Sequence, residues 1–168
     1  QMQREDRMTG LPNRRAFVEY MERIRTGEVG CRDAVLTYIR LEGLNERNDR
    51  LGLQAGDEAV IAAARCVADF CRACEDGGES VSCFRTGGNE FALIRPEPRA
   101  NSGQLHRQFS AIVARYNRTC APRARITMTY GFSRLCDEDG KSRSISAWKA
   151  EADAYLKRNE TRLGGDTE

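Results

Sequence analysis

Histidine is nearly absent from this chain: His106 is the only one in 168 residues. A metal site built from several histidines is therefore excluded, and a Ser-His-Asp triad could form only around His106. The 27 basic and 25 acidic residues leave no excess charge that would indicate a nucleic-acid partner or a membrane surface. No apolar run approaches ~18 residues, so no transmembrane segment is expected. No signal peptide is visible at Gln1, and we expect a cytoplasmic protein.

Regular cysteine spacing is also missing. The seven cysteines are odd in number and irregularly placed, which favours reduced thiols over a disulfide framework: Cys31, Cys66, Cys71, Cys74, Cys83, Cys120 and Cys136. The "CRAC" segment at 71–74 fits a redox or metal-binding C-x-x-C pattern, but it lies near the end of a helical pattern. Packing as small hydrophobic residues is the favoured interpretation, because a zinc site would need a second such pair.

The residues that are present predict one α+β domain. Apolar residues make up 40% of the chain and charged residues 31%, as in soluble globular proteins. Periodicity predicts helices over 11–27, 54–75, 101–119 and 146–162, a short helical turn within 42–52, and strands over 34–41, 77–85, 89–96 and 124–135. This order indicates a central, mostly antiparallel sheet flanked by helices, close to the split β-α-β type. Residues 1–5 are expected to end an upstream linker helix, 6–163 to form the domain, and 164–168 to be a polar tail.

The segment "FRTGGNEFALIRP" (84–96) is a strong hairpin signal, with two strand-like runs around a Thr-Gly-Gly-Asn turn. Gly87 and Gly88 have two interpretations. They supply the positive φ angles of a tight turn, or they let a ligand approach the backbone while Glu90 holds a cation. The local sequence does not choose between these.

Four motifs that occur in one order along the chain favour the ligand-binding interpretation of the two glycines. "DRMTGLPNRRAF" (6–17), "NDRLGLQAGDE" (48–58), "RTGGNEF" (85–91) and "TYGFS" (129–133) give residues 6–163 a resemblance to a GGDEF domain. This is the module of diguanylate cyclases, which make cyclic di-GMP from two GTP molecules. The resemblance implies a fold of the nucleotidyl-cyclase and polymerase-palm type. It also implies Mg²⁺ as cofactor and a homodimer in which two domains each present one GTP.

The resemblance assigns nucleotide-binding residues position by position. Asn48 and Asp57 match the residues that contact guanine, whose acceptor O6 and donors N1–H and N2–H suit an amide plus a carboxylate. A bland alternative for Asp57 is that it caps the second helix. The glycines of the hairpin, Gly87 and Gly88, belong to the same site.

The resemblance also assigns the phosphate contacts. The backbone amides of Gly43, Leu44 and Asn45 match the phosphate-cradling loop after the first strand. Arg158 and Arg162 match a Lys and an Arg that bind the triphosphate. Their spacing of four residues predicts that both lie on one face of the last helix.

The metal site departs from the family pattern. Arg40 stands where the family has a metal-binding Asp, and Asn89 stands where the signature has Asp or Glu. Glu90 and Glu42 remain as candidate metal ligands. Because a guanidinium repels a cation, we expect Mg²⁺ to bind weakly or not at all and catalysis to be impaired. We expect Arg40 and Glu90, as neighbours at the hairpin tip, to pair directly or through water.

The inhibitory Arg-x-x-Asp of the family is missing as well, because its aligned position holds "GESV" (78–81), and "RACE" (72–75) lies too far upstream. The favoured function is a catalytically degenerate GGDEF domain that binds GTP or GDP and regulates an attached module, such as an EAL phosphodiesterase domain. The alternatives are an active diguanylate cyclase and a ligand-free interaction or scaffold domain.

Overall fold

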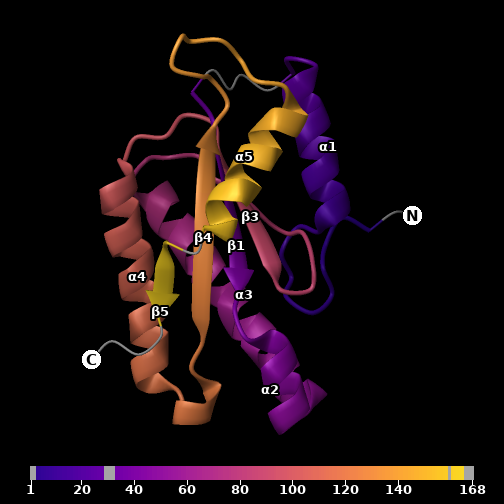
Figure 1. Cartoon of the computed structure of the whole chain (residues 1–168), viewed down its shortest axis with the longest axis vertical. Coiled ribbons are helices and arrows are strands. Elements are labelled where there is room, and N and C mark those ends of the chain that lie inside the picture. The colour runs from indigo at the N-terminus through magenta and orange to yellow at the C-terminus, as the bar shows by residue number, and fades with distance from the viewer. Residues whose placement is uncertain (1–2, 29–32, 159, 165–168) are drawn as a thin grey trace.

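The computed structural model describes residues 3–28, 33–158 and 160–164 (Figure 1). Its elements, in chain order, are α1 (Arg14–Arg25), β1 (Val35–Leu41), α2 (Leu44–Leu51), α3 (Leu53–Asp76), β2 (Ser82–Arg85), β3 (Glu90–Arg95), α4 (Ser102–Thr119), a 3₁₀ turn (Pro122–Ala124), β4 (Thr127–Arg134), α5 (Ile145–Lys157) and β5 (Arg162–Gly164). Within these described residues, no helix combines the length and the apolar character needed to cross a membrane.

The strands form one antiparallel sheet in the order β2-β3-β1-β4-β5, which confirms the α+β prediction. β1 lies in the middle, because it pairs with β3 on one side and β4 on the other. The register sets Arg40 of β1 opposite Glu90 of β3 and Thr129 of β4. Side chains of directly opposed residues share one face of a sheet, so these three lie on the same face.

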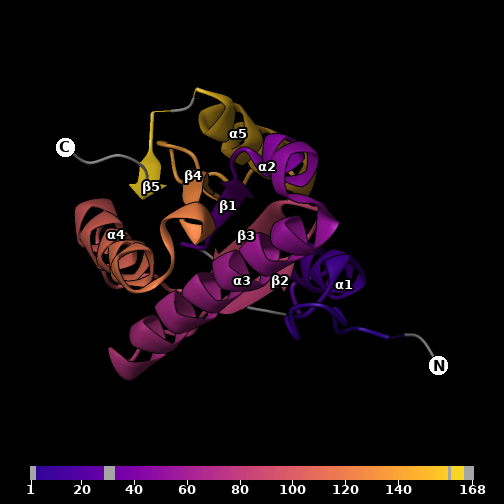
Figure 2. The same ribbon diagram turned by 90° about the horizontal axis from the view of Figure 1, so that it is seen from below.

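Helices cover both faces of the sheet, and each face has its own core. α3 and α4 pack on one face, where Phe70 stacks on Phe109 with ring centroids 4.4 Å apart. α1 and α5 pack on the other, around the fully buried Trp148, whose indole N–H donates to the Ser133 carbonyl at 2.9 Å. Figure 2 shows α5 on the opposite side of the sheet from α3 and α4.

Local sequence signals explain the helix starts. The Asn13 side chain accepts a hydrogen bond from the Ala16 amide and caps α1, as the Pro12-Asn13 pair predicts. Asn101 and Gln104 form a reciprocal capping box at α4. Cys74 is buried, and burial raises its pKa to about 11, which disfavours the thiolate that redox or zinc chemistry requires. The packing interpretation of "CRAC" therefore fits best, and Cys31 lies outside the described residues.

Several boundaries differ from the predictions. Residues 3–5 are not the end of a helix, because Glu5 pairs with Pro12 in an isolated bridge. α5 ends at Lys157 rather than continuing to 162. Gly164 belongs to β5 and not to a polar tail, whose remaining residues, 165–168, lie outside the described part. The segment after β1 is a complete helix, α2, rather than a single turn.

Candidate functional site

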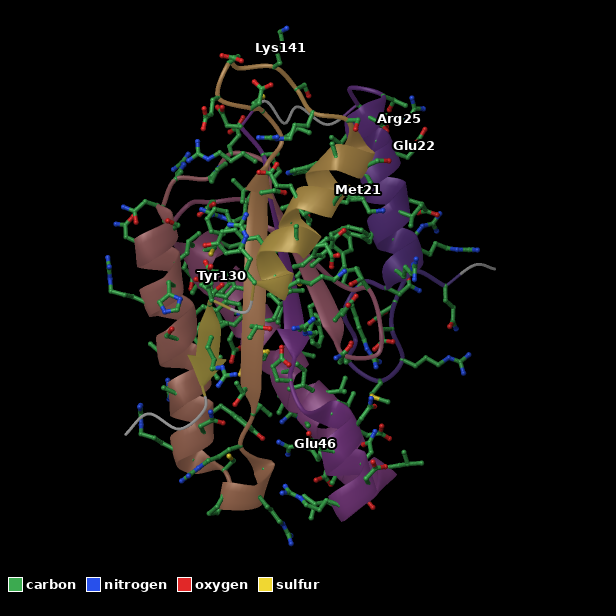
Figure 3. All side chains as sticks on the ribbon, viewed as in Figure 1. Met21, Glu22, Arg25, Glu46, Tyr130 and Lys141 are labelled. Atoms are coloured by element: carbon green, nitrogen blue, oxygen red, sulfur yellow. The ribbon has the colours of Figure 1, made fainter. Side chains whose placement is uncertain are left out.

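A cavity of about 420 Å³ opens where β1 ends, and we call it the β1–α2 cavity. Three elements supply its walls: the end of β1, the start of α2 and the β2–β3 turn. It is lined by Arg40, Leu41, Glu42, Gly43, Leu44, Asn45, Glu46, Gly88 and Asn89. In Figure 3, Glu46 marks the position of α2 at the lower end of the molecule. The structure thus brings together most of the residues that the sequence assigns to phosphate and metal.

Arg40 and Glu42 pair with each other inside this cavity. The Arg40 Nε donates to Glu42 Oε1 at 2.9 Å, and the Thr129 hydroxyl donates to the same oxygen at 2.5 Å. Both charged side chains are half-buried, with 28% and 30% of their surface exposed. Burial by itself would raise the pKa of Glu42, but the hydrogen bonds from Thr129 and Arg40 and the positive charge of Arg40 hold it below its ordinary value.

The predicted Arg40–Glu90 salt bridge is therefore wrong. The two residues are register partners, but the guanidinium turns along its own strand end to Glu42. The Glu90 side chain instead lines a separate cavity of about 310 Å³ with Arg14 and Lys149. Tyr38 lies in the same cavity, where burial, Asp153 and Glu90 raise its pKa to about 12. We attribute the pairing of Arg40 with Glu42 to the Thr129 hydroxyl, whose hydrogen bond holds the Glu42 carboxylate beside Arg40.

Two hydrogen bonds between Asn89 and Leu41 join the β2–β3 turn to the end of β1, and we call them the latch. The Asn89 amide donates to the Leu41 carbonyl at 3.1 Å, and the Leu41 N–H donates to the Asn89 carbonyl at 2.8 Å. Neither Gly87 nor Gly88 has a positive φ, so the prediction that they serve the turn in this way is wrong. A Cβ at Gly88 would meet nothing within 4 Å, so the space beside it is open to a ligand.

The first turn of α2 faces the same cavity. Gly43 precedes the helix with φ 71°, a left-handed conformation that favours glycine, and no side chain caps the helix start. The N–H groups of the first helical turn, including Leu44 and Asn45, have no partner within a helix, and they carry the positive end of its dipole. This geometry suits an anion such as a phosphate group.

Asn48 lies where α2 meets α3, over a helical glycine. A Cβ on Gly56 would lie only 1.6 Å from Asn48 Oδ1, so the amide occupies the volume that any other side chain at 56 would fill. Asn48 Oδ1 is buried and has no hydrogen-bond partner among the described residues. Asp57 follows on the exposed surface of α3. We call Asn48, Gly56 and Asp57 the α2–α3 corner.

The alternative role for Asp57, a helix cap, is wrong. α3 begins at Leu53, with Gly52 in the cap position and no side-chain cap hydrogen bond. Asp57 is therefore inside the helix, one residue after the glycine on which Asn48 rests. Its carboxylate forms no ion pair or hydrogen bond within the described part of the chain and is open to a ligand.

The two predicted triphosphate arginines separate. Arg158 follows the last residue of α5, and its guanidinium lies 5.5 Å from the centre of the Tyr155 ring, in a cavity beside the β4–α5 loop. Arg162 lies on β5, opposite Thr129, and its charge contributes to the lowered pKa of Glu42. The prediction of one shared helical face is therefore wrong, and only Arg162 lies near the β1–α2 cavity.

The donor set does not suit the Mg²⁺ that the resemblance implies. In the described residues, no group of three or more His, Cys, Asp and Glu side chains gathers as a metal site. Glu42 is paired with Arg40, Asn89 directs its amide nitrogen to Leu41, and Glu90 lines another cavity. Magnesium needs several oxygen ligands at near-octahedral positions, and a guanidinium at the centre of the site opposes it.

Two residues of the site escape the sequence-based prediction. Gly56 stands inside a helical pattern, where glycine costs ~1 kcal/mol relative to alanine. This cost is the signal in the sequence that glycine has a packing or functional reason there. Thr129 is one of many strand threonines, and only the register across β1 and β4 reveals that it holds Glu42.

Comparison with known proteins identifies the family of this chain. The family model "Diguanylate cyclase, GGDEF domain" matches residues 3–164. Diguanylate cyclase VdcA of Vibrio cholerae is 32% identical over 111 residues, which cover 66% of this chain and 29% of VdcA. Diguanylate cyclase DgcN of Escherichia coli is 27% identical over 112 residues, which cover 67% of this chain and 26% of DgcN. The chain thus spans less than a third of the length of these relatives.

Solved structures show the same fold. The GGDEF domain of FimX from Pseudomonas aeruginosa superposes with a TM-score of 0.72 at 20% identity, covering 94% of both chains. The GGDEF domain of DgcB from Caulobacter crescentus, solved with c-di-GMP, gives a TM-score of 0.71 at 23% identity and covers 94% of this chain and 90% of its own. With the family model matching nearly the whole chain, this protein belongs to the GGDEF family of diguanylate cyclase domains, the domains of cyclic di-GMP signalling.

Proposed function

We propose that this GGDEF domain binds a guanine nucleotide without converting it to cyclic di-GMP and regulates a module attached to it. The contrast between two neighbouring groups of residues supports the proposal. In the α2–α3 corner, Asn48 and Asp57 leave polar groups without partners. At the metal position, Arg40 and Glu42 satisfy each other. A site with a free base-reading half and a blocked metal half binds a nucleotide but does not activate it.

The α2–α3 corner offers the hydrogen-bonding pattern that guanine needs. Because Asn48 Oδ1 is buried against Gly56, its amide nitrogen is the group left to donate to guanine O6. The Asp57 carboxylate accepts from N1–H and N2–H. Adenine presents the opposite pattern, and each buried polar group that the wrong base leaves unpaired costs about 1–3 kcal/mol.

The phosphates then lie in the β1–α2 cavity. The free N–H groups at the start of α2 receive them, and Arg162 adds a positive charge nearby. Arg40 neutralises Glu42, which would otherwise repel the phosphates, and so does part of the work of a cation. Nucleotide binding therefore needs no divalent metal, although cyclases of this family generally use Mg²⁺.

Two-metal phosphoryl transfer needs ions that activate the attacking hydroxyl and neutralise the leaving group. With Arg40 and Asn89 in place of acids, the active-cyclase alternative has no support at this site. Free nucleotide-binding groups in turn argue against a pure scaffold. The attached module is of the regulatory type, with an EAL phosphodiesterase domain as the specific candidate.

Calorimetry with GTP and ATP tests the proposal, with Mg²⁺ and with EDTA. GTP should bind in both buffers, ATP more weakly, and chromatography should detect no cyclic di-GMP. Asp57→Ala should remove the preference for GTP, whereas Asp49→Ala, which removes an exposed carboxylate of α2, should not. Equal affinity for the two nucleotides, or binding only with Mg²⁺, would contradict the proposal, and no binding at all would favour the scaffold alternative.

A further inference from the structure

A further cavity, of about 350 Å³, lies on the face of the sheet covered by α3 and α4. We call it the α4 cavity. Val35 and Thr37 of β1 line it, so it lies toward the start of the strand whose other end carries Arg40. Tyr130 reaches it from β4, and Figure 3 shows this side chain between β4 and α4. Nothing in the proposed nucleotide site uses this cavity.

The body of the α4 cavity is apolar. Aromatic and aliphatic side chains from α3, β3, α4 and β4 form its walls: Phe70, Leu93, Leu105, Phe109 and Phe132. Phe70 and Phe109 stack on each other with ring centroids 4.4 Å apart, and both line the cavity. A volume of about 350 Å³ is within the range of sites that hold small organic molecules, ~300–1,000 Å³.

Three polar side chains that line the cavity, those of His106, Tyr130 and Arg95, already have partners. His106 Nδ1 and the Tyr130 hydroxyl are hydrogen-bonded at 2.7 Å, and His106 Nε2 lies 3.3 Å from the Ser110 hydroxyl. Arg95 is fully buried, but Glu79 balances its charge at 2.5 Å, and the Ala100 carbonyl accepts from its Nη2 at 3.2 Å. These three side chains have little hydrogen-bonding capacity left for a polar ring such as a nucleobase.

The rim of the cavity is positively charged. Arg99 and Arg134 line it, both are exposed, and neither forms an ion pair within the described residues. No Asp or Glu is among the described residues that line the cavity. An apolar interior below two free guanidinium groups is complementary to a molecule with an apolar body and an anionic end.

We propose that the α4 cavity binds a small amphipathic organic anion, with an aromatic or branched apolar body inside and one carboxylate or sulfonate at Arg99 and Arg134. The apolar body replaces water against Phe70 and Phe109, and the anion takes hydrogen bonds from the guanidinium groups. The cavity lies toward the other end of β1 from the nucleotide site, so the two ligands bind independently of each other.

The probe is 8-anilinonaphthalene-1-sulfonate, an aromatic monoanion whose fluorescence rises in apolar sites. N-phenyl-1-naphthylamine has the same ring system without the sulfonate and reports the contribution of the charge. The double variant Arg99→Gln/Arg134→Gln should weaken binding of the sulfonate about tenfold and leave the neutral compound unchanged. The matched control, Arg107→Gln/Arg115→Gln, removes the same charge from exposed positions of α4 and should change neither.

A filling variant tests the location. Leu105→Trp places an indole in the cavity and should abolish binding of both compounds, with an unchanged circular dichroism spectrum as the check of folding. GTP should not displace either compound. The proposal is overturned if the Arg99 and Arg134 variant binds the sulfonate as the parent does, if the control loses as much affinity, or if GTP competes. If Leu105→Trp does not fold, the charge variants still decide.

Discussion

The α2–α3 corner and the Arg40–Glu42 pair differ in how their polar groups are satisfied. Asn48 holds a buried oxygen with no partner among the described residues, and Gly56 provides the room for it. Arg40 and Glu42 are bonded to each other, and Thr129 completes the cluster. A buried polar group without a partner costs free energy, whereas a paired group does not.

This difference indicates what each half of the site is for. The exposed Asp57 carboxylate, which has no partner among the described residues, is available to a ligand, whereas the buried Asn48 Oδ1 stays packed against Gly56. The paired half gains nothing from a metal ion, because an ion would have to break the Arg40–Glu42 interaction before binding. The proposed base-reading group thus keeps polar atoms without partners among the described residues, and the proposed metal group is paired within itself.

The largest effect is expected from the double variant Arg40→Asp/Asn89→Asp. It restores acids at the two positions where this chain departs from the metal site of the family. At ~4 Å and an effective dielectric of ~20, removing the guanidinium removes roughly 8 kcal/mol of repulsion toward a divalent cation before screening. GTP binding should then become dependent on Mg²⁺ or Mn²⁺ in calorimetry, while the parent chain stays independent of metal. Arg50→Asp, an equal charge change on the exposed surface of α2, is the control.

Cyclic di-GMP formation by the parent chain is a second test of the same contrast. The parent chain should give no product with either metal at any protein concentration, by chromatography. Product from the parent chain would mean that the Arg40–Glu42 pair opens during turnover, and the contrast between the two halves would fail.

The next test displaces Asn48 in the α2–α3 corner. Gly56→Ala adds a methyl group 1.6 Å from the Asn48 oxygen, so Asn48 must leave its place. GTP affinity should fall by ~10–100-fold, equivalent to ~1–3 kcal/mol for lost base contacts. The free energy of unfolding should not fall in parallel, because alanine gains ~1 kcal/mol over glycine inside a helix.

Gly103→Ala in α4 is the matched control, since a Cβ there meets its nearest atom, Asn101 Oδ1, at 3.4 Å, an ordinary contact. It should leave GTP affinity unchanged. If Gly56→Ala binds GTP as the parent chain does, Asn48 does not read the base.

Local patterns predict the elements of this fold well where cap signals and periodicity agree. Asn13 caps α1, and the long apolar pattern of α3 gives its core residues. β5 was missed because a three-residue strand has too few residues to show alternation, and Arg162 continues the charged pattern of α5. The strand forms through pairing with β4, a contact distant in sequence that no local pattern carries.

The site residues were predicted from family motifs, and the predictions that failed concern the direction in which a side chain turns. The motifs assign Gly43, which lines the β1–α2 cavity, and Asn48, which packs against Gly56. They do not decide whether Arg40 turns across the sheet to Glu90 or along the chain to Glu42. The period of two puts Glu42 on the face of Arg40, and the register between β1 and β3 puts Glu90 there. Only Glu42 also accepts a hydrogen bond from Thr129.

A smaller effect is expected at the latch between the hairpin and β1. In Asn89→Asp, a carboxylate oxygen replaces the amide nitrogen that donates to the Leu41 carbonyl, so two acceptors meet. The free energy of unfolding should fall by ~1–2 kcal/mol in urea titrations. Asn45→Asp, in the first turn of α2, should instead be neutral or slightly stabilising, because an acid there complements the helix dipole. An unchanged stability in Asn89→Asp would mean that the latch contributes nothing.

The smallest effect concerns pH and the Arg40–Glu42 pair. The pKa of Glu42 is lower in the folded chain than its ordinary value of 4.5, so the folded state binds fewer protons than the unfolded state in this range. Its contribution is therefore present above pH 4.5 and is lost as the pH falls through the folded pKa. Because the pair is half-buried, this contribution is ~1 kcal/mol at most.

Glu42→Gln should remove this contribution. The difference in unfolding free energy between parent and variant should be present at pH 7 and should shrink steadily as the pH falls below 4.5. Glu58→Gln, at an exposed position of α3, should give no such pH-dependent difference. A difference that stays constant from pH 7 to pH 3 would show that Glu42 is not held as a carboxylate by Arg40 and Thr129. The two halves of the site would then differ less than their contacts imply.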